Sequence, residues 1–353
     1  MKCATTFAFL AVAACGHDAL FRSGDYATTQ PFGNGVFHRI TRNIGNDMTP
    51  TWLSDGTGVS YAFDESPTGA GTCVGLIAPE GGTRQTIPCL DHLATDSVAN
   101  SVWPVVAADG RVAYVWENVP PFPDLPRPDT AIVFLDELNT PGARRAVFHL
   151  PYLIPGVALY RTLSHLGWLN RDTLVAVARS TTLVNDCPSC PLQLAALDLD
   201  VVLLDLTTTP ATLTIVPGTN PASAVAPGSS GDDVYYTLDG DTRVFHRVLS
   251  TGDTSVVHDF GAAGIARDVR VAGNRLVAVV GGKVNYHVYL GPTPVQTDSG
   301  GFLHLLDLGT SLDSILPDSG VSYRHPTLSA TGDRLVVEGW QTGPPDLWFF
   351  RLP

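Results

Sequence analysis

The sequence predicts an all-β fold, a six-bladed β-propeller with four-stranded antiparallel blades. The first reason is a strand–turn–strand phrase, Pro50-Thr-Trp-Leu-Ser-Asp-Gly-Thr-Gly-Val-Ser-Tyr-Ala-Phe63, which recurs in weaker form at Pro104–Val115 and at Pro326–Val337. The second is that turn signals recur at intervals of roughly 40 to 60 residues, which is typical of a repeat of short strands without helices. The six turns lie at 55–56, 109–110, 170–172, 230–232, 272–274 and 331–333.

The N-terminus has the composition of an export signal. Lys2 precedes a short apolar run, Phe7-Ala-Phe-Leu-Ala-Val-Ala-Ala14, so residues 1–14 read as a secretory signal peptide. The run continues into Cys15-Gly16 and resembles the bacterial lipoprotein processing motif, which implies a lipidated Cys15. The alternative is an ordinary cleaved signal with an incidental cysteine. Residues 15–32 are small and polar, and we expect them to form a flexible tether.

Composition limits the class of protein. The 353 residues are 44% hydrophobic and only 16% charged, which is enough to fill a core and disfavours disorder. The 34 acidic residues outnumber the 21 basic ones and give a net charge of −13. An acidic surface repels phosphate backbones, so nucleic acid is not an expected partner.

The propeller is expected to span residues 33–353. A strand follows each turn, at 59–63, 112–116, 174–178, 234–237, 276–280 and 335–338. The sixth unit reaches Pro353 without an outer strand, whereas an alternating stretch at 36–41 precedes the first unit and has no partner there. Pairing that stretch with the strand at 347–352 closes the ring and removes two free strand edges.

The phrase Pro50-Thr-Trp-Leu-Ser-Asp-Gly56 resembles the WD40-like repeat of TolB and of prolyl-oligopeptidase propeller domains. The resemblance is close in the first unit, fair in the second and sixth, and degenerate between them. It implies a TolB-type six-bladed propeller over about residues 36–353. A β-sandwich followed by a second β domain is the alternative architecture, and it predicts no such regularity.

Four cysteines outside the N-terminal region suggest two disulfides. Cys73 and Cys89 flank a predicted hairpin that turns near Gly81, so they are expected to face each other and pair. Cys187-Pro-Ser-Cys190 has the spacing of a redox motif or half a zinc site. No helix is predicted after it and no further ligands are close in the sequence, which favours a small structural disulfide instead.

Candidate binding residues lie where the innermost strands begin, because that end of a propeller gathers loops from every blade. Arg267, Arg324 and His325 suit an anionic partner group such as a carboxylate, and His165 and Trp103 are placed beside them. The same ends carry Asp47, Asn100, Asn220 and Asp268, whose oxygens are of the type that calcium prefers. Alternatively, the arginines only neutralise Asp47 and Asp268.

The sequence contains no Gly-x-Ser-x-Gly elbow, phosphate loop, dinucleotide fingerprint or His-Glu-x-x-His motif. We therefore predict a lipid-anchored module of a bacterial cell envelope that binds a protein or peptide, without catalysis and without a cofactor. The alternative is a calcium-dependent hydrolase or lactonase that uses the propeller funnel.

Overall fold

β-strands make up nearly all of the regular structure. The computed structural model describes residues 30–32, 35–41, 45–64, 71–89, 98–119, 130–138, 140, 144–150, 153–154, 157–184, 193–290, 293–318, 320–341 and 344–353. Within these residues the one helical element is a short 3-10 helix, η1 (Gly261–Ala263). None of the described residues form a helix long and apolar enough to cross a membrane.

The first large sheet follows the chain through two antiparallel groups. The first group contains β3 (Asp47–Trp52), β4 (Val59–Phe63), β5 (Gly71–Ile77) and β6 (Gln85–Thr86). The second contains β7 (Val98–Val106), β8 (Arg111–Val119), β9 (Thr130–Glu137) and β10 (Arg145–Leu150). A short parallel contact between β5 and β7 joins the two groups.

Two smaller antiparallel sheets follow. One contains β11 (Leu153–Ile154), β12 (Val157–Asn170), β13 (Thr173–Val184), β14 (Gln193–Asp205) and β15 (Thr212–Ile215). The other contains β16 (Ala222–Pro227), β17 (Asp233–Leu238), β18 (Arg243–Val248) and β19 (Thr254–Asp259). In both sheets each strand pairs with its neighbour in the sequence.

The last sheet joins the two ends of the described chain. Its later strands are β20 (Ala266–Ala272), β21 (Arg275–Leu290), β22 (Thr293–Asp307), β23 (Asp313–Ile315), β24 (Ser322–Leu328), β25 (Arg334–Trp340) and β26 (Asp346–Arg351). The early strands β1 (Gln30–Phe32) and β2 (Gly35–Arg39) complete it. β2 pairs antiparallel with β26, with Phe37 opposite Phe350, as predicted for the stretch at 36–41 and the strand at 347–352.

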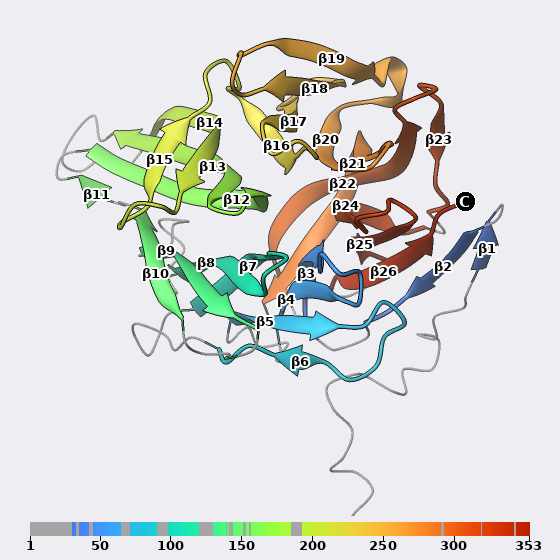
Figure 1. Cartoon of the computed structure of the whole chain (residues 1–353), viewed down its shortest axis with the longest axis horizontal. Helices are drawn as coiled ribbons and strands as arrows, with labels where there is room; N and C mark the ends of the chain where they lie inside the picture. Colours follow the sequence, from blue (N-terminus) through green and yellow to red (C-terminus); the bar gives the residue numbers. More distant parts are fainter. Residues whose placement is uncertain are drawn as a thin grey trace, which may run out of the picture.

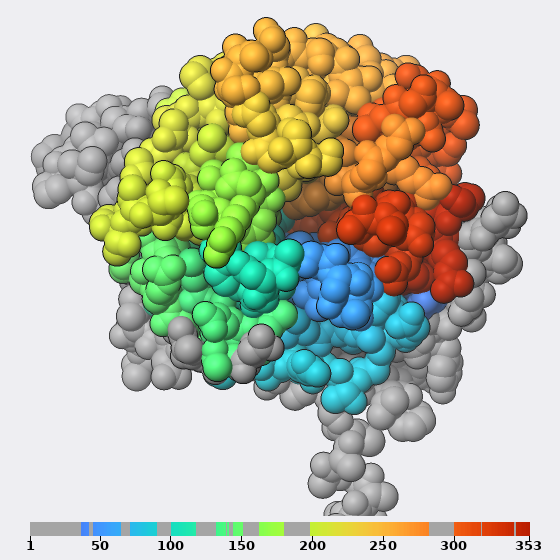
Figure 2. All heavy atoms as spheres, viewed as in Figure 1, coloured from blue at the N-terminus to red at the C-terminus, as the bar shows by residue number. Residues whose placement is uncertain are grey.

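The sheets lie side by side around a common centre, and β2 lies next to β26 (Figure 1). Segments from the beginning, middle and end of the chain meet around that centre in the space-filling view (Figure 2). The strands nearest the centre are β3, β7, β12, β16, β20 and β24; each contacts the next of these strands, and β24 contacts β3. Each then makes a tight turn into the next strand.

The first of these turns shows why the repeat carries glycine. Gly56 has a φ of 69°, in the left-handed region that glycine adopts without steric cost. Asp55 Oδ1 accepts hydrogen bonds from the backbone N–H of Thr57, at 2.9 Å, and from its hydroxyl, at 2.7 Å. The Asp-Gly phrase is therefore a turn signal with a local cause, and β4 begins where the sequence predicts.

Apolar side chains fill the space between neighbouring groups. Val105, Val115 and Val133 of the second group pack in one cluster with Leu163, Leu174 and Val202 of the third. A further cluster joins the first and last groups and contains Val59, Tyr61, Phe63, Val336, Leu347 and Phe349. The core is thus distributed around the centre, between the faces of neighbouring sheets.

The predicted disulfide between Cys73 and Cys89 is confirmed, with Cα atoms 5.1 Å apart. Cys15, Cys187 and Cys190 lie outside the described residues, as does the predicted signal peptide. The β21–β22 hairpin is longer than the sequence led us to expect, because β21 continues to Leu290 rather than ending near Val280. The alternating stretch Val284-Asn-Tyr-His-Val-Tyr-Leu290 has the composition of a strand, which accounts for the extension.

Candidate functional site

Every innermost strand has a break in its pairing register. The breaks lie between Met48 and Thr51, Val102 and Val105, Ser164 and Gly167, Ala222 and Ala224, Ala266 and Asp268, and Arg324 and Thr327. Such bulges bend a strand and re-aim the side chain within the break. Each break lies a few residues before the turn that follows its strand, so the breaks turn side chains toward one place, which we call the mouth.

Four of the bulged residues have backbone conformations that are uncommon for residues other than glycine. Their φ angles are positive: 50° at Thr49, 56° at Trp103, 53° at His165 and 47° at His325. Each such residue costs on the order of 1–3 kcal/mol and persists only where the surroundings enforce it. Strained residues of this kind often occur at functional sites, so the mouth is the candidate functional site.

Three of these strained residues contact one another through their rings. The Trp103 ring centroid lies 4.4 Å from that of His165 and 4.5 Å from that of His325. The two imidazole centroids are 5.6 Å apart. Both histidines are buried. Because the three residues come from β7, β12 and β24, this ring cluster ties together strands that are far apart in the sequence.

A buried carboxylate lies against the ring cluster. Asp268 accepts backbone N–H hydrogen bonds from His325, at 3.0 Å, and from Val269, at 2.8 Å, and its Oδ2 is 3.5 Å from His165 Nε2. Burial opposes its charge, but His165, Arg270 and His325 outweigh that effect and hold the pKa of Asp268 well below its usual range. Asp268 is therefore ionised at neutral pH.

His165 stays neutral beside this carboxylate. Burial lowers the pKa of His165 to about 4, even though Asp268 favours the protonated imidazole. Its Nδ1 is 3.1 Å from the hydroxyl of Ser164. The imidazole therefore keeps an unprotonated nitrogen at neutral pH, which is the form that can accept a hydrogen bond or bind a metal.

His325 is oriented by a second buried carboxylate. Glu338 is fully buried, and its Oε2 accepts the backbone N–H of Thr49 at 2.9 Å and lies 2.6 Å from His325 Nδ1. A carboxylate only accepts hydrogen bonds, so the proton between them is on Nδ1. His325 Nε2 then faces Arg324 Nη2, at 3.2 Å.

The mouth contains two adjoining cavities. A cavity of about 180 Å³ is lined by His165, Arg267, Asp268, Arg324 and His325, together with Ser223 and Asp239. A larger one of about 600 Å³ shares His165, Arg324 and His325 with it and adds Trp103, Asn100, Glu117 and Glu338. All five residues predicted for partner binding therefore line these cavities.

At the mouth, Arg267 has N–H donors that are available to a ligand. Its Nε donates to the backbone carbonyl of Gly281 at 2.8 Å, which fixes the side chain. Its two Nη groups make no hydrogen bond to the residues that the structure describes. This guanidinium is therefore able to bind an acceptor that enters the cavity.

The structure places the four residues predicted for calcium in different surroundings. Asp268 lies against the ring cluster and lines the smaller cavity, and Asn100 lines the larger one. Asp47 is buried, and its backbone N–H donates to the carbonyl of Pro345. Asn220 is exposed and donates to Asp198, at 3.3 Å.

The structure assembles a different set of metal-binding types. His165, Asp268 and His325 each offer a ligand atom within 4.8 Å of the others. The sequence pattern points to these three residues separately, without grouping them, and the strand starts do not include Glu338. Its sequence context could have identified Glu338. An isolated carboxylate in the apolar run Leu335-Val-Val-Glu-Gly-Trp340 needs a buried partner.

No family model matches the chain, and no curated protein matches it either. Solved structures do. A gluconolactonase from Xanthomonas campestris is 15% identical, with 93% of this chain and 94% of that chain covered and a TM-score of 0.53. TolB from Acinetobacter baumannii is 12% identical, with 85% and 64% covered and a TM-score of 0.51. An oligogalacturonate lyase from Vibrio parahaemolyticus is 9% identical, with 93% and 96% covered and a TM-score of 0.50.

These likenesses show the fold. The chain is an all-β protein with a β-propeller fold, in agreement with the repeat that the sequence contains. The similar structures include enzymes as well as TolB, and identities of this size do not transfer an activity. The chemistry of the mouth is therefore the basis for a function.

Proposed function

We propose that the protein is a six-bladed propeller, closed by β2, that acts as a binding module for a protein partner with an exposed carboxylate. The groups β3–β6, β7–β10, β12–β15, β16–β19 and β20–β23 supply five blades. The strands β24–β26 with β2 supply the sixth. The apolar cluster shared by the first and last groups supports closure.

One observation carries the binding role. Arg267 and Arg324 line the smaller cavity, where their two positive charges balance those of Asp239 and Asp268, although the chain as a whole has a net charge of −13. Because this site has no excess of negative charge and Arg267 keeps two Nη groups without a hydrogen bond to the described residues, it suits an anionic group better than the rest of an acidic chain does. Trp103, with its ring against both histidines, is of the residue type found most often as an interface anchor.

The proposed location of the protein is a bacterial cell envelope. It depends on the N-terminal sequence, in which the apolar run ends at Cys15 with the spacing of a lipoprotein signal. A lipid anchor followed by a tether would hold the propeller close to a membrane without inserting it. The partner is then another envelope protein or a peptide segment of one.

The binding role is tested with Arg267→Ala and with the double variant Arg267→Ala, Arg324→Ala, each used as bait in envelope extract. The matched control is Arg145→Ala, which removes an exposed arginine from β10. We expect partner capture to fall about tenfold or more in the first two proteins, since a charge-assisted hydrogen bond is lost. Lower melting temperatures with unchanged capture would show that the arginines are structural.

A second candidate is a divalent metal centre with hydrolase or lactonase activity. It is favoured by the proximity of His165, Asp268 and His325 and by the Glu338 carboxylate on His325 Nδ1, an arrangement that orients metal-binding imidazoles. Two imidazoles and one carboxylate suit zinc or manganese better than calcium. Calorimetric titration of the wild-type protein with each of the three ions distinguishes the candidates. Binding that disappears in His165→Ala would replace the binding role with the metal centre.

A further inference from the structure

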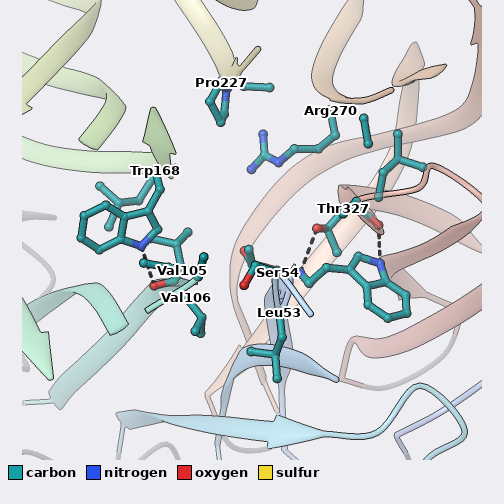
Figure 3. Close-up of a pocket in the computed structure, with 18 of the residues that line it drawn as sticks. Leu53, Ser54, Val105, Val106, Trp168, Pro227, Arg270 and Thr327 are labelled. Atoms are coloured by element: carbon teal, nitrogen blue, oxygen red, sulfur yellow. Dashed lines mark hydrogen bonds between the residues drawn. The ribbon is translucent and has the colours of Figure 1, made fainter. Parts of the chain in front are cut away.

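A third cavity, larger than the two at the mouth, lies at the opposite end of the innermost strands. Along β7, Val102 and Trp103 line the mouth, whereas Val105 and Val106 line this cavity of about 670 Å³ (Figure 3). We call it the turn-face pocket because the turns after β3, β7, β12 and β24 surround it. Its volume lies within the range of about 300–1,000 Å³ typical of small-molecule sites.

Most of the wall of the turn-face pocket is apolar. The wall residues come from the centre of the molecule and include Val105, Val106, Leu166, Trp168, Ala226, Pro227 and Leu328. Trp168 is fixed by a hydrogen bond from its indole N–H to the carbonyl of Val105, at 3.2 Å, so that its ring forms a rigid side of the cavity (Figure 3). Such a wall favours an alkyl or aromatic group over a heavily hydrated one.

One charged group points into this apolar space. The guanidinium of Arg270, on β20, projects into the pocket, although the side chain is only 13% exposed (Figure 3). Its Nη1 donates to the carbonyls of Val225 and Val269, each at 2.9 Å, which fixes its position. Nε and Nη2 make no hydrogen bond to any part of the chain that the structure describes.

The charge on Arg270 is incompletely compensated. Its nearest carboxylate oxygen is Asp268 Oδ1, at 3.7 Å from Nη1, which is beyond hydrogen-bond distance. The side chain is largely buried and its hydrogen bonds to described residues all come from Nη1, so an anion at Nε and Nη2 would supply further partners.

The other charged residues of the lining add to this positive character. Asp109 is paired with Arg111, at 2.9 Å, and Arg171 contributes a further positive charge at the rim. The titratable lining therefore contains three arginines and one aspartate, in a chain with many more acidic than basic residues. One buried guanidinium in an apolar wall matches a ligand with one negative charge, and a polyphosphate would exceed it.

We propose that the turn-face pocket binds a small amphipathic monocarboxylate. Its carboxylate accepts two hydrogen bonds, from Nε and Nη2 of Arg270, and its alkyl or aromatic part packs on Val105, Leu166 and Trp168. Two parallel N–H···O bonds to a carboxylate are the strongest contact that arginine makes. The site is distinct from the mouth, because the ring cluster occupies the other end of the same strands.

The test uses the full-length protein and calorimetric titration with 3-phenylpropionate and octanoate. The neutral control ligand is 3-phenylpropanamide, which has nearly the same shape as the first acid. We expect the acids to bind and the amide to bind about tenfold to a hundredfold more weakly. Arg270→Met should remove this preference, whereas Arg145→Ala, which removes an exposed arginine of β10, should leave it intact.

Arg270 also contacts β16 and Asp268, so its replacement can reduce stability. A second variant avoids this problem. Ala330→Phe adds a ring at an exposed turn residue of the lining and should block binding without a large change in melting temperature. Ala262→Phe, at an exposed position in η1, is the matched control. Equal affinity for acid and amide, no binding of either acid at millimolar concentration, or wild-type binding by Ala330→Phe would overturn the proposal.

Discussion

Glu338 links distant parts of the chain at the level of single residues. It accepts the backbone N–H of Thr49, from the first innermost strand, and orients His325, from the last. Removing one partner of a buried charge usually costs about 3–5 kcal/mol, because the remaining charge is left without compensation. The carboxylate is therefore part of what holds the strained conformations of Thr49 and His325.

His165 makes stability depend on pH in a predictable direction. Its pKa is about 4 in the folded protein and 6.5 in a model peptide, so the unfolded chain binds more protons between these values. The free energy of unfolding should therefore be greatest above pH 6.5 and should fall by up to about 3 kcal/mol as the pH drops to 4. Asp268 loses its own contribution only at lower pH, because its folded pKa is depressed below the usual carboxylate range.

Urea unfolding at pH 7, 5.5 and 4.5 measures this dependence. In His165→Gln most of the loss between pH 6.5 and 4 should disappear, whatever the effect of the substitution on absolute stability. His149→Gln, which replaces an exposed histidine of β10, should retain the wild-type dependence. Identical slopes in all three proteins would show that His165 is not the responsible group.

Several residues that line the mouth could be predicted from the sequence, but the contacts between them could not. Arg267, Arg324 and His325 were found because they stand at strand starts, and strand starts follow from turn signals. The contacts between His165, Asp268 and His325 depend on bulges, and no local signal in the sequence marks a positive φ at a histidine or a tryptophan. The ring contacts of Trp103 and the 2.6 Å contact of Glu338 with His325 are tertiary consequences of those bulges.

Among the strands, β2 connects the beginning of the described chain to its end by pairing with β26. Its Phe37 is 2% exposed and stacks on Trp348 with centroids 5.1 Å apart. Phe37 also lies 4.8 Å from the ring of Phe350, and both belong to the apolar cluster between the last two groups. β2 therefore contributes core packing as well as backbone hydrogen bonds to β26.

Deletion of residues 31–42 should expose the edge of β26 and remove Phe37 from the core. We expect aggregation or loss of cooperative unfolding, because a free strand edge pairs with other chains. Phe37→Ala is the milder form and should cost about 3–5 kcal/mol. Thermal melting and light scattering measure both effects.

The matched control for this deletion removes residues 16–28, upstream of every described strand. It should melt as the wild-type protein does. If the protein that lacks residues 31–42 shows the same melting curve, then β2 does not hold the ends together.

The elements were predictable to the extent that they have local causes. β4 has the bounds that alternation and the Asp55-Gly56 turn predict, and the strand at 347–352 appears as β26. The parallel contact of β5 with β7 and the long β21–β22 hairpin were not predicted. The β5–β7 contact joins two repeats, and nothing within one repeat predicts it. The β21–β22 hairpin lengthens its repeat, whereas the prediction relied on repeats of similar length.

For the whole molecule, charge is unevenly distributed along the centre. The chain carries a net charge of −13, but arginines line both the mouth and the turn-face pocket. Such local exceptions speed the approach of anionic groups at low ionic strength, and salt screens them over a Debye length of about 8 Å at physiological ionic strength. Partner capture at the mouth should accordingly weaken as salt rises.

Where the molecule works depends on residues before the propeller. If Cys15 is lipidated, the mature chain begins there, and the tether of residues 15–32 places the propeller within reach of a membrane. Mass spectrometry of the membrane fraction should then find an acylated N-terminal Cys15, and Cys15→Ser should shift the protein to the soluble fraction. Cys3→Ser is the matched control, because the signal peptide containing it is removed in either case. A Cys15→Ser protein that stays in the membrane fraction would assign the attachment to something other than lipid on this residue.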